Sequence, residues 1–414
     1  MNQPIDPTGR QNQADRWLIT GAWGLAFAFL AWSILVQLAI QVLPGSLAQI
    51  VAPNSPAVLT RLAEERLVES RFDAAERLAR AALARQLFNA RALRTLGYAV
   101  DQGGDKVAAD KLMTLAGNWT LRDTAAHLWL YDYRLRTGEF ESAFAHLDTV
   151  LRLQPELRAG AFAGLQRGLA VDREALAPIA ERLSYDPNWR APFLAHLGVT
   201  AEGQAIAANL ALALKGAGKQ LSEAELEALF RAMLAKRNFS LLKALGLRLD
   251  PGLGRARLMN GDFEGAPGPF PFNWELNGGP GATVDLATIE QSGSKGLIVE
   301  YDGYSAAPLV RQLILLPPGP YTLAGESQTD GDPRLLQWSV SCAESGARLQ
   351  LESRAPAHGQ PGAPGQSDTF SAGFQVPDQG CAMQWIALVT NPGERRDVVA
   401  ATYDNIRILP RGTN

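Results

Sequence analysis

The segment 55–156 repeats itself every 34 residues. Residues 55–88 are SPAVLTRLAEERLVESRFDAAERLARAALARQLF, residues 89–122 are NARALRTLGYAVDQGGDKVAADKLMTLAGNWTLR, and residues 123–156 are DTAAHLWLYDYRLRTGEFESAFAHLDTVLRLQPE. A small residue recurs at one position and a leucine at another: Ala75, Ala109 and Ala143, and Leu62, Leu96 and Leu130. The copies are rich in Ala, Leu, Arg and Glu, which is a helical composition.

The repeat resembles the tetratricopeptide repeat, in which each unit is a pair of antiparallel helices. The small residues suit this pattern, because an alanine lets the neighbouring helix approach where a larger side chain would push it away. Two other aligned positions depart from the family: Lys106 stands where Phe72 and Phe140 do, and Ala63 and Tyr131 replace a glycine. The resemblance implies an all-α solenoid, which we expect to span residues 55–251.

Helical composition continues after the third copy, with a shortened fourth unit at 157–187 and further helices at 201–214 and 222–247. Ser222 followed by Glu225 predicts a capping box. Arrays of this family present a groove to a partner protein, and Trp129, Tyr133 and Arg134 are the candidate groove residues. The alternative is that the array is only a rigid spacer and that these side chains are core or solvated surface.

An apolar run precedes the repeats. Residues 17–43 contain no charged side chain, and about 20 such residues in a helix cross a bilayer. The run predicts a transmembrane helix after a cytoplasmic tail, residues 1–16, since Arg10 and Arg16 flank it on that side. We therefore expect a single-pass protein of the cell inner membrane with its bulk periplasmic. A cleaved signal peptide is the alternative, but its apolar stretch is shorter, about 7–15 residues.

From residue 255 the composition changes: Gly and Pro become frequent and apolar residues alternate with polar ones, which predicts strands. Several stretches resemble the jelly roll of carbohydrate-binding modules, also called the galactose-binding-like fold: residues 258–264 with Trp274, 310–323 and 403–408. The resemblance implies an all-β sandwich over 255–410. The chain is thus expected to be multidomain, with a transmembrane helix, an all-α solenoid and an all-β jelly roll.

The same resemblance implies two kinds of site in the sandwich. Relatives often hold a structural calcium near the first and last strands, and the residues that would supply its oxygen ligands here are Asp262, Glu264 and Asp404. Turn hydrogen bonds and surface contacts of Asp262 and Glu264 are the alternative. Glycan binding needs exposed aromatic rings, and Tyr301 and Tyr304, at a strand end or loop, are the candidates. Trp338 and Trp385 lie in strands with Val and Cys on the same face, which predicts that both are buried.

The chain has two cysteines, Cys342 and Cys381, both in expected strands. In an oxidising compartment such a pair is expected to form a disulfide. Two unrelated buried thiols are the alternative.

Composition and motifs exclude several classes of function. A net charge of −3 and a pI near 5.9 argue against a nucleic-acid partner. Two cysteines and four scattered histidines predict no cofactor beyond the calcium. We find no G-x-S-x-G, H-E-x-x-H or phosphate-binding glycine motif, so we expect no enzyme.

The domain combination favours a membrane-anchored adaptor or scaffold in envelope or exopolysaccharide assembly. It would bind a protein of such a complex through the helices and a polysaccharide through the jelly roll. The alternatives are a polysaccharide lyase or hydrolase, and a structural tether that binds only protein.

Overall fold

The computed structural model describes residues 27, 29–38, 42, 45–266, 268–289, 293–304, 306, 308–353, 368–394 and 396–411. The chain divides into two compact units, residues 1–158 and residues 159–414. The division lies inside the helical part of the sequence. The expected domain boundaries, 55–251 and 255–410, stay predictions.

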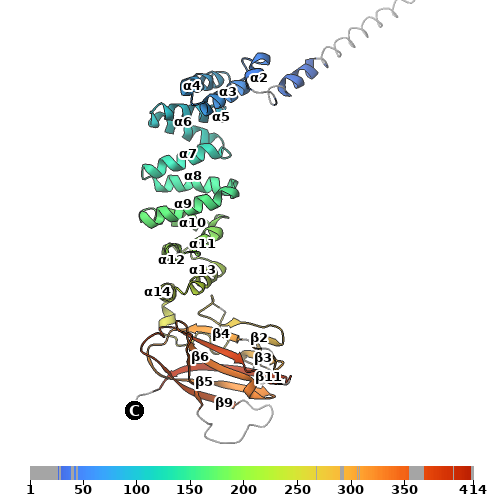
Figure 1. Ribbon diagram of the computed structural model, residues 1–414, viewed down its shortest axis with the longest axis vertical. Helices are drawn as coiled ribbons and strands as arrows, with labels where there is room; N and C mark the ends of the chain where they lie inside the picture. The colour runs from blue at the N-terminus through green and yellow to red at the C-terminus, as the bar shows by residue number, and fades with distance from the viewer. Residues whose placement is uncertain are drawn as a thin grey trace, which may run out of the picture. The chain divides into compact units, whose positions relative to one another are not determined.

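The first unit consists of helix pairs that follow one another along the chain (Figure 1). After the short helix α2 (Gly45–Val51), the pairs are α3 (Pro56–Val68) with α4 (Phe72–Leu83), α5 (Ala90–Gln102) with α6 (Lys106–Trp119), and α7 (Thr124–Arg136) with α8 (Phe140–Leu153), followed by the 3₁₀ turn η1 (Pro155–Leu157). The first helices begin at residues 56, 90 and 124, and the second helices at 72, 106 and 140. Both series advance by the 34 residues that the sequence repeat predicts.

The helix ends follow from local chemistry. Asn89, Asp105 and Asp123 precede α5, α6 and α7, and each side chain accepts a hydrogen bond from a backbone N–H of the first turn. The turn inside each pair contains a residue with positive φ, and these residues are also 34 apart: Ser70 (58°), Gly104 (97°) and Gly138 (79°). Ser70 is the one that has a Cβ in this left-handed conformation, which glycine adopts at lower cost.

Close packing of the pairs depends on the predicted small residues. Ala75, Ala109 and Ala143 are fully buried. The close approach between α5 and α6 has a second small residue, because a Cβ on Gly97 would lie 3.1–3.2 Å from the Met113 side chain. The pattern read from the sequence therefore marks the helix crossings.

The second unit begins with six helices: α9 (Arg158–Val171), α10 (Leu176–Ser184), α11 (Arg190–Leu197), α12 (Ala201–Gly216), α13 (Glu223–Ala235) and α14 (Phe239–Leu249), with the 3₁₀ turn η2 (Pro251–Gly254) after them. The capping box of Ser222 and Glu225 at the start of α13 is confirmed. Arg190 adds a second partner for that glutamate, since its guanidinium lies 2.7 Å from Glu225 Oε1.

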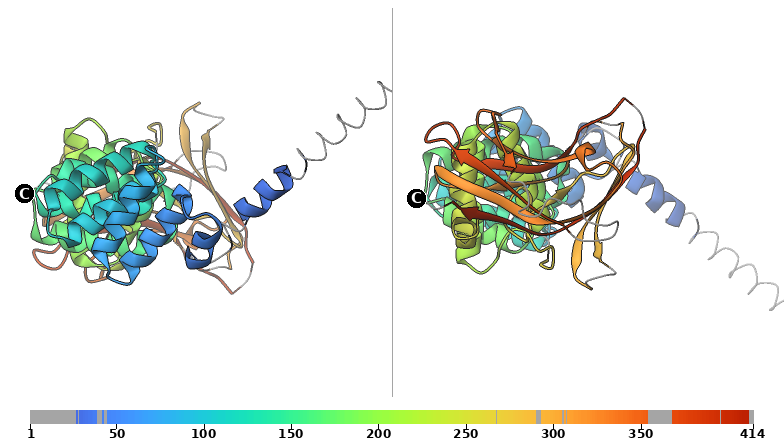
Figure 2. Two further views of the ribbon diagram at one scale, coloured as in Figure 1. Left: turned by 90° about the horizontal axis from the view of Figure 1, so that it is seen from above. Right: turned by 90° about the horizontal axis from the view of Figure 1, so that it is seen from below.

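The rest of the second unit is a β-sandwich, whose strands are seen from below in Figure 2. The described strands are β1 (Glu275–Leu276), β2 (Ala282–Thr288), β3 (Lys295–Tyr301), β4 (Pro308–Ile314), β5 (Gly319–Asp330), β6 (Leu336–Cys342), β7 (Arg348–Leu349), β8 (Glu352–Ser353), β9 (Asp368–Val376), β10 (Gln384–Thr390) and β11 (Val399–Pro410), with the 3₁₀ turn η3 (Pro333–Leu335) before β6. They form antiparallel sheets in the orders β1-β4-β10-β6-β7 and β2-β3-β11-β5-β9-β8. One apolar core, which includes Val299, Leu323 and Ile386, lies between the sheets.

The two strand tryptophans lie on opposite faces of the first sheet. Trp338 is in the core, as expected. The expectation for Trp385 is wrong: this side chain is half-buried and pairs in register with Ser341, whereas its neighbour Ile386 pairs with the core residue Val340. The pattern that groups Trp385 with Cys381 on one face fails because Cys381 lies in the loop before β10, and alternation holds only within a strand.

The transmembrane prediction is corrected. Among the described residues, no helix is both long enough and apolar enough to cross a membrane. Within the apolar run 17–43, the structure describes residues 27, 29–38 and 42. Residues 17–26, 28, 39–41 and 43, and the expected tail 1–16, lie outside the described residues. We therefore withdraw the transmembrane helix, the membrane partner and the location in the inner membrane with a periplasmic bulk.

Candidate functional site

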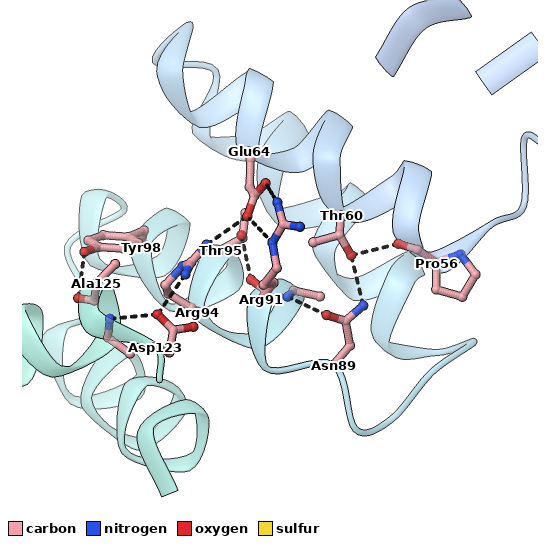
Figure 3. A network of polar contacts seen from close by, with 12 residues as sticks. Pro56, Thr60, Glu64, Asn89, Arg91, Arg94, Thr95, Tyr98, Asp123 and Ala125 are labelled. Atoms are coloured by element: carbon pink, nitrogen blue, oxygen red, sulfur yellow. Dashed lines mark hydrogen bonds and ion pairs between the residues drawn. The ribbon is translucent and has the colours of Figure 1, made fainter. Parts of the chain in front are cut away.

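A chain of ion pairs connects the first helices of three successive pairs in the first unit (Figure 3). The guanidinium of Arg94, on α5, lies 2.8 Å from Glu64 Oε1 on α3 and 2.7 Å from Asp123 Oδ1 at the start of α7. Arg91 contacts the same glutamate at 2.5 Å, and this hydrogen bond raises the pKa of Arg91. The carboxylates on this face are thus already neutralised by arginines of the array.

Neutral groups on this face also join one helix pair to the next. Tyr98 donates to the carbonyl oxygen of Ala125 at 3.1 Å, and the Asn89 amide donates to Thr60 Oγ1 at 3.0 Å (Figure 3). Most polar side chains here therefore hold the array together. Arg91, whose side chain is mostly exposed, is the one in this network that best presents charge to a partner.

The expected groove residues differ in how far they are already bound within the protein. Trp129 and Tyr133 are half-buried and stack one helical turn apart on α7, with ring centroids 5.0 Å apart. Arg134 is committed to the protein itself, since its guanidinium lies 2.7 Å from Asp110 on α6 and 2.9 Å from Glu139. A groove over these three residues stays a prediction, and Arg134 contributes to it mainly by positioning α6 against α7.

A histidine pair between α7 and α8, in which His127 is buried and His146 half-buried, is not visible in the sequence pattern. Nδ1 of His127 lies 2.9 Å from Nδ1 of His146, so one nitrogen donates and the other accepts. Burial lowers the pKa of both residues, and for His146 the neighbouring His127 and Arg134 add to the effect, giving a pKa of about 4. The two positions are 19 residues apart in the sequence, which is no ligand spacing; only the folded helix pair brings them together.

In the sandwich, one of the two candidate tyrosines is buried and the other is exposed. Tyr301 is only 1% exposed and belongs to the core, so the prediction that it stacks on a sugar is wrong. Alternation along β3 puts it on the same inward face as Leu297 and Val299. Tyr304, three residues further in the following loop, is 60% exposed.

The loop that presents Tyr304 is well supported. The backbone N–H of Tyr304 donates to Asp302 Oδ1 at 3.0 Å, and the guanidinium carbon of Arg396 lies 5.8 Å from the centre of its ring. Gly303 has φ of 76°, and a Cβ there would lie 2.4 Å from the carbonyl oxygen of Asp397. Glycine is therefore required for the close approach of the two loops that place an aromatic ring, a guanidinium and a carboxylate together.

The three calcium candidates make internal hydrogen bonds. Glu264 accepts from the backbone N–H of Lys295 at 2.6 Å, Asp404 accepts from Ser294 Oγ at 3.1 Å, and Asp262 accepts from the N–H of Glu264 at 3.4 Å. The described part of the chain contains no group of three or more His, Cys, Asp or Glu residues placed to hold a metal ion. The calcium site stays a prediction, and the bonding favours the alternative of turn and loop contacts.

The predicted disulfide is confirmed: Cys342, at the end of β6, is bonded to Cys381, in the loop before β10. Both cysteines are buried. The bond joins two segments 39 residues apart in the sequence.

A cluster of arginines and aromatic rings lies on the outer face of the first sheet. Phe270 stacks on Trp385 with centroids 5.9 Å apart, and Arg311 lies 4.9 Å from the Trp385 ring centre. Glu275 accepts from Arg311 at 2.5 Å and from Arg231 of α13 at 2.8 Å. Although burial acts to raise the pKa of Glu275, these two arginines lower it overall. The cluster joins helix α13 to the sandwich within the second unit, and it covers Trp385 with protein.

No protein-family model matches the chain, and no curated protein matches it either. The solved structures similar to it include tetratricopeptide-repeat proteins and a carbohydrate-binding module. Pilf from Pseudomonas aeruginosa is 17% identical over 59% of this chain and 95% of its own, with a TM-score of 0.27. The C-terminal part of a TPR repeat-containing protein from Cytophaga hutchinsonii is 17% identical over 54% of this chain and 94% of its own, with a TM-score of 0.27.

The third similar structure is a CBM4 carbohydrate-binding module, 17% identical over 37% of this chain and 99% of its own, with a TM-score of 0.25. TM-scores this far below 0.5 do not establish a shared function. The helix spacing and the sheet order described above are what define the two parts of this protein.

Proposed function

We propose that the protein is a non-catalytic adaptor that couples a protein partner, bound by the helix pairs, to a polysaccharide, bound by the sandwich. The observation that carries the glycan half is Tyr304. A mostly exposed ring, held by a supported loop next to Arg396 and Asp302, offers a flat apolar surface together with hydrogen-bonding groups. Binding sites for small polar ligands typically combine these two features.

The protein-binding half is supported by the repeated helix pairs of the first unit. Such arrays stack to form an extended surface that can contact a long segment of a partner. The internal ion pairs around Arg94 make this surface rigid before any partner arrives, which lowers the ordering cost of binding.

Three carboxyl groups of the second unit serve in ion pairs with arginines. A glycosidase needs a carboxylic acid whose pKa is raised so that it can donate a proton. For Glu225 burial acts to raise the pKa, but hydrogen bonds from Arg190 and Ser222 lower it overall, and Arg334 lowers the pKa of Asp332 to about 2. With Glu275, these carboxylates are held in the ionised form by arginines, which suits structural ion pairs rather than acid catalysis.

A glycan array probed with the full chain tests the proposal. We expect binding to at least one class of oligosaccharide and a loss of about tenfold in affinity for Tyr304→Ala, roughly 1.4 kcal/mol. Tyr185→Ala is the matched control, because Tyr185 is 63% exposed and also has an arginine, Arg182, 5.4 Å from its ring centre, but belongs to the helical part. Binding that survives Tyr304→Ala, or the absence of any bound glycan, would remove the glycan half of the proposal.

A further inference from the structure

Large apolar side chains are exposed on the connections between successive helix pairs of the first unit. They are Leu87 and Phe88 between α4 and α5, Leu121 between α6 and α7, and Leu153 and Leu157 at and after the end of α8. Their exposed fractions run from 38% for Leu157 to 80% for Phe88. We refer to these five residues as the apolar stripe.

The connections that carry the stripe lie next to one another in space. The Arg85 guanidinium donates to Asn54 at 2.9 Å, which joins the connection before α3 to the one before α5. The rings of Phe88 and Trp119 have centroids 5.4 Å apart, and Gln154 Nε2 lies 3.4 Å from Thr124 Oγ1. The three connections that carry the five apolar side chains therefore follow one another along one edge of the unit.

The turns inside the helix pairs show that this composition is not required by the architecture. They consist of Glu69, Ser70 and Arg71, then Gly103, Gly104 and Asp105, then Thr137, Gly138 and Glu139. These turns contain no apolar side chain, and the exposed apolar residues that flank them are single valines, Val68 at the end of α3 and Val107 in the first turn of α6. Contiguous exposed apolar surface is uncommon on soluble proteins and often marks an interaction site.

The charges beside the stripe define the chemistry of its partner. Arg85 and Arg122 are exposed, and among the described residues no carboxylate forms an ion pair with either. The first two connections of the stripe thus each carry an exposed arginine, whereas the last one carries the exposed carboxylate of Glu156. A second copy of the chain would bring these arginines against each other, whereas a segment with acidic residues beside its apolar ones would neutralise them.

We propose that the apolar stripe is the docking surface for an acidic amphipathic helix of a partner protein. This inference rests on the proposed adaptor function and assigns its protein-binding half to this surface. Helices that pack together lie about 8–10 Å apart, so a stripe over three successive connections is on the order of 20–30 Å long. At 1.5 Å per residue, a helix of about 14–20 residues covers that length. Its apolar side chains would recur at i, i+3 or i+4 and i+7, with Asp or Glu next to them.

A peptide-display selection on the full chain tests this proposal. The probe is a library of random 20-residue peptides, selected on the wild-type protein and then measured one by one against variants. The stripe variant combines Leu87→Ser, Phe88→Ser and Leu121→Ser. The control variant combines Val68→Ser and Val107→Ser, because both valines are exposed in the same unit but lie outside the stripe. Since all five substituted side chains are exposed, both variants should remain folded, and thermal unfolding checks this.

We expect the enriched peptides to have apolar residues at helical spacing and a net negative charge. They should bind the control variant like the wild type and the stripe variant at least tenfold more weakly. Arg122→Glu should weaken binding about threefold or more, and less so at high salt.

Several outcomes would overturn the proposal. Enriched peptides that bind the stripe variant as tightly as the wild type would do so, as would peptides of net positive charge. Stripe-dependent binding to vesicles of phosphatidylserine and phosphatidylcholine would assign the stripe to a lipid surface instead, and stripe-dependent dimerisation would assign it to a second copy. Peptides lost by Arg91→Glu but not by the stripe variant would disprove the stripe and leave the adaptor function standing, while a selection without any enriched peptide would disprove both.

Discussion

The helix pairs of the first unit are stabilised by contacts between residues close in the sequence, whereas the β-sandwich of the second unit is stabilised by contacts between residues far apart in it. In the first unit, a residue meets partners about one repeat away, as Glu64 meets Arg91 and Arg94. In the sandwich, β3 pairs with β11 although about a hundred residues separate them, and the disulfide spans 39. Damage in the first unit should therefore pass from one pair to its neighbours, whereas the sandwich should lose stability as a whole. The predictions below test this difference.

The largest expected effect is on the sandwich. Replacing Cys342 and Cys381 by Ser removes a cross-link that closes a loop of 39 residues, and the chain-entropy estimate for that size is about 4 kcal/mol. Hydrogen exchange measured by mass spectrometry should show faster exchange in strands of both sheets together and unchanged protection in α3–α8. Faster exchange confined to β6 and the loop before β10 would contradict cooperative unfolding of the sandwich.

Ala109→Trp should give the next largest effect, in the first unit. Ala109 is fully buried at the α6 crossing, and such overpacking costs typically about 1–3 kcal/mol, with a tryptophan at the upper end. Protection should fall in α5, α6 and their neighbours and remain in the sandwich.

Lys106→Trp is the matched control for Ala109→Trp. Phe72 and Phe140 occupy the equivalent first positions of α4 and α8, so an aromatic ring is accommodated there. The change removes the ion pair between Lys106 and Asp101, whose Nζ–Oδ1 distance is 2.6 Å, and should cost about 1 kcal/mol or less. Equal damage from the two variants would show that the 34-residue register is wrong.

The histidine pair should make the first unit, but not the sandwich, sensitive to mild acid. The pKa of both imidazoles is lowered in the folded protein, to about 4 for His146, while the unfolded chain takes up protons from pH 6.5 downwards. Stability should therefore fall as the pH drops from 6.5 towards about 4. Asp123 opposes this by favouring protonated His127, and Arg134 adds to it. Allowing for partial exposure, we expect a loss on the order of 1 kcal/mol. The protection factors of α7 and α8 at pH 7.5 and 5, which correct for the intrinsic exchange rate at each pH, measure it. In the variant with both histidines replaced by Gln, the difference in protection should disappear.

The smallest effect should come from the turn inside the first helix pair. Ser70→Gly removes the strain of a left-handed serine, and after the added freedom of the unfolded chain is subtracted, about 0.5 kcal/mol of stabilisation should remain. Gly104→Ser, at the equivalent position of the next pair, should destabilise by a similar amount. Thermal unfolding of both variants measures the difference, and a shift of the same sign in both would show that φ at this position does not govern the turn.

Much of the helical part could be predicted from the sequence because its information is local. A helix pair, its close-packed alanines and its capping residues all lie within one 34-residue unit, so their spacing is visible directly. Even there, the sequence missed the contact between His127 and His146, which depends on how two helices face each other. Arg134 was expected to face a partner, but the tertiary structure places Asp110 of the preceding helix against it.

In the sandwich, the sequence by itself determined the all-β class of the domain and the pairing of its two cysteines, since no other thiol was available. It did not determine which side chains are presented. Alternation has a period of two, so an error of one residue in where a strand begins moves every side chain to the other face, as it did for Trp385. Tyr301 and Tyr304 differ by three positions in the sequence, yet one fills the core and the other meets solvent, because β3 ends between them. The strand ends, and with them the candidate site, depend on partners such as β11 that lie about a hundred residues away, and only the folded chain brings those together.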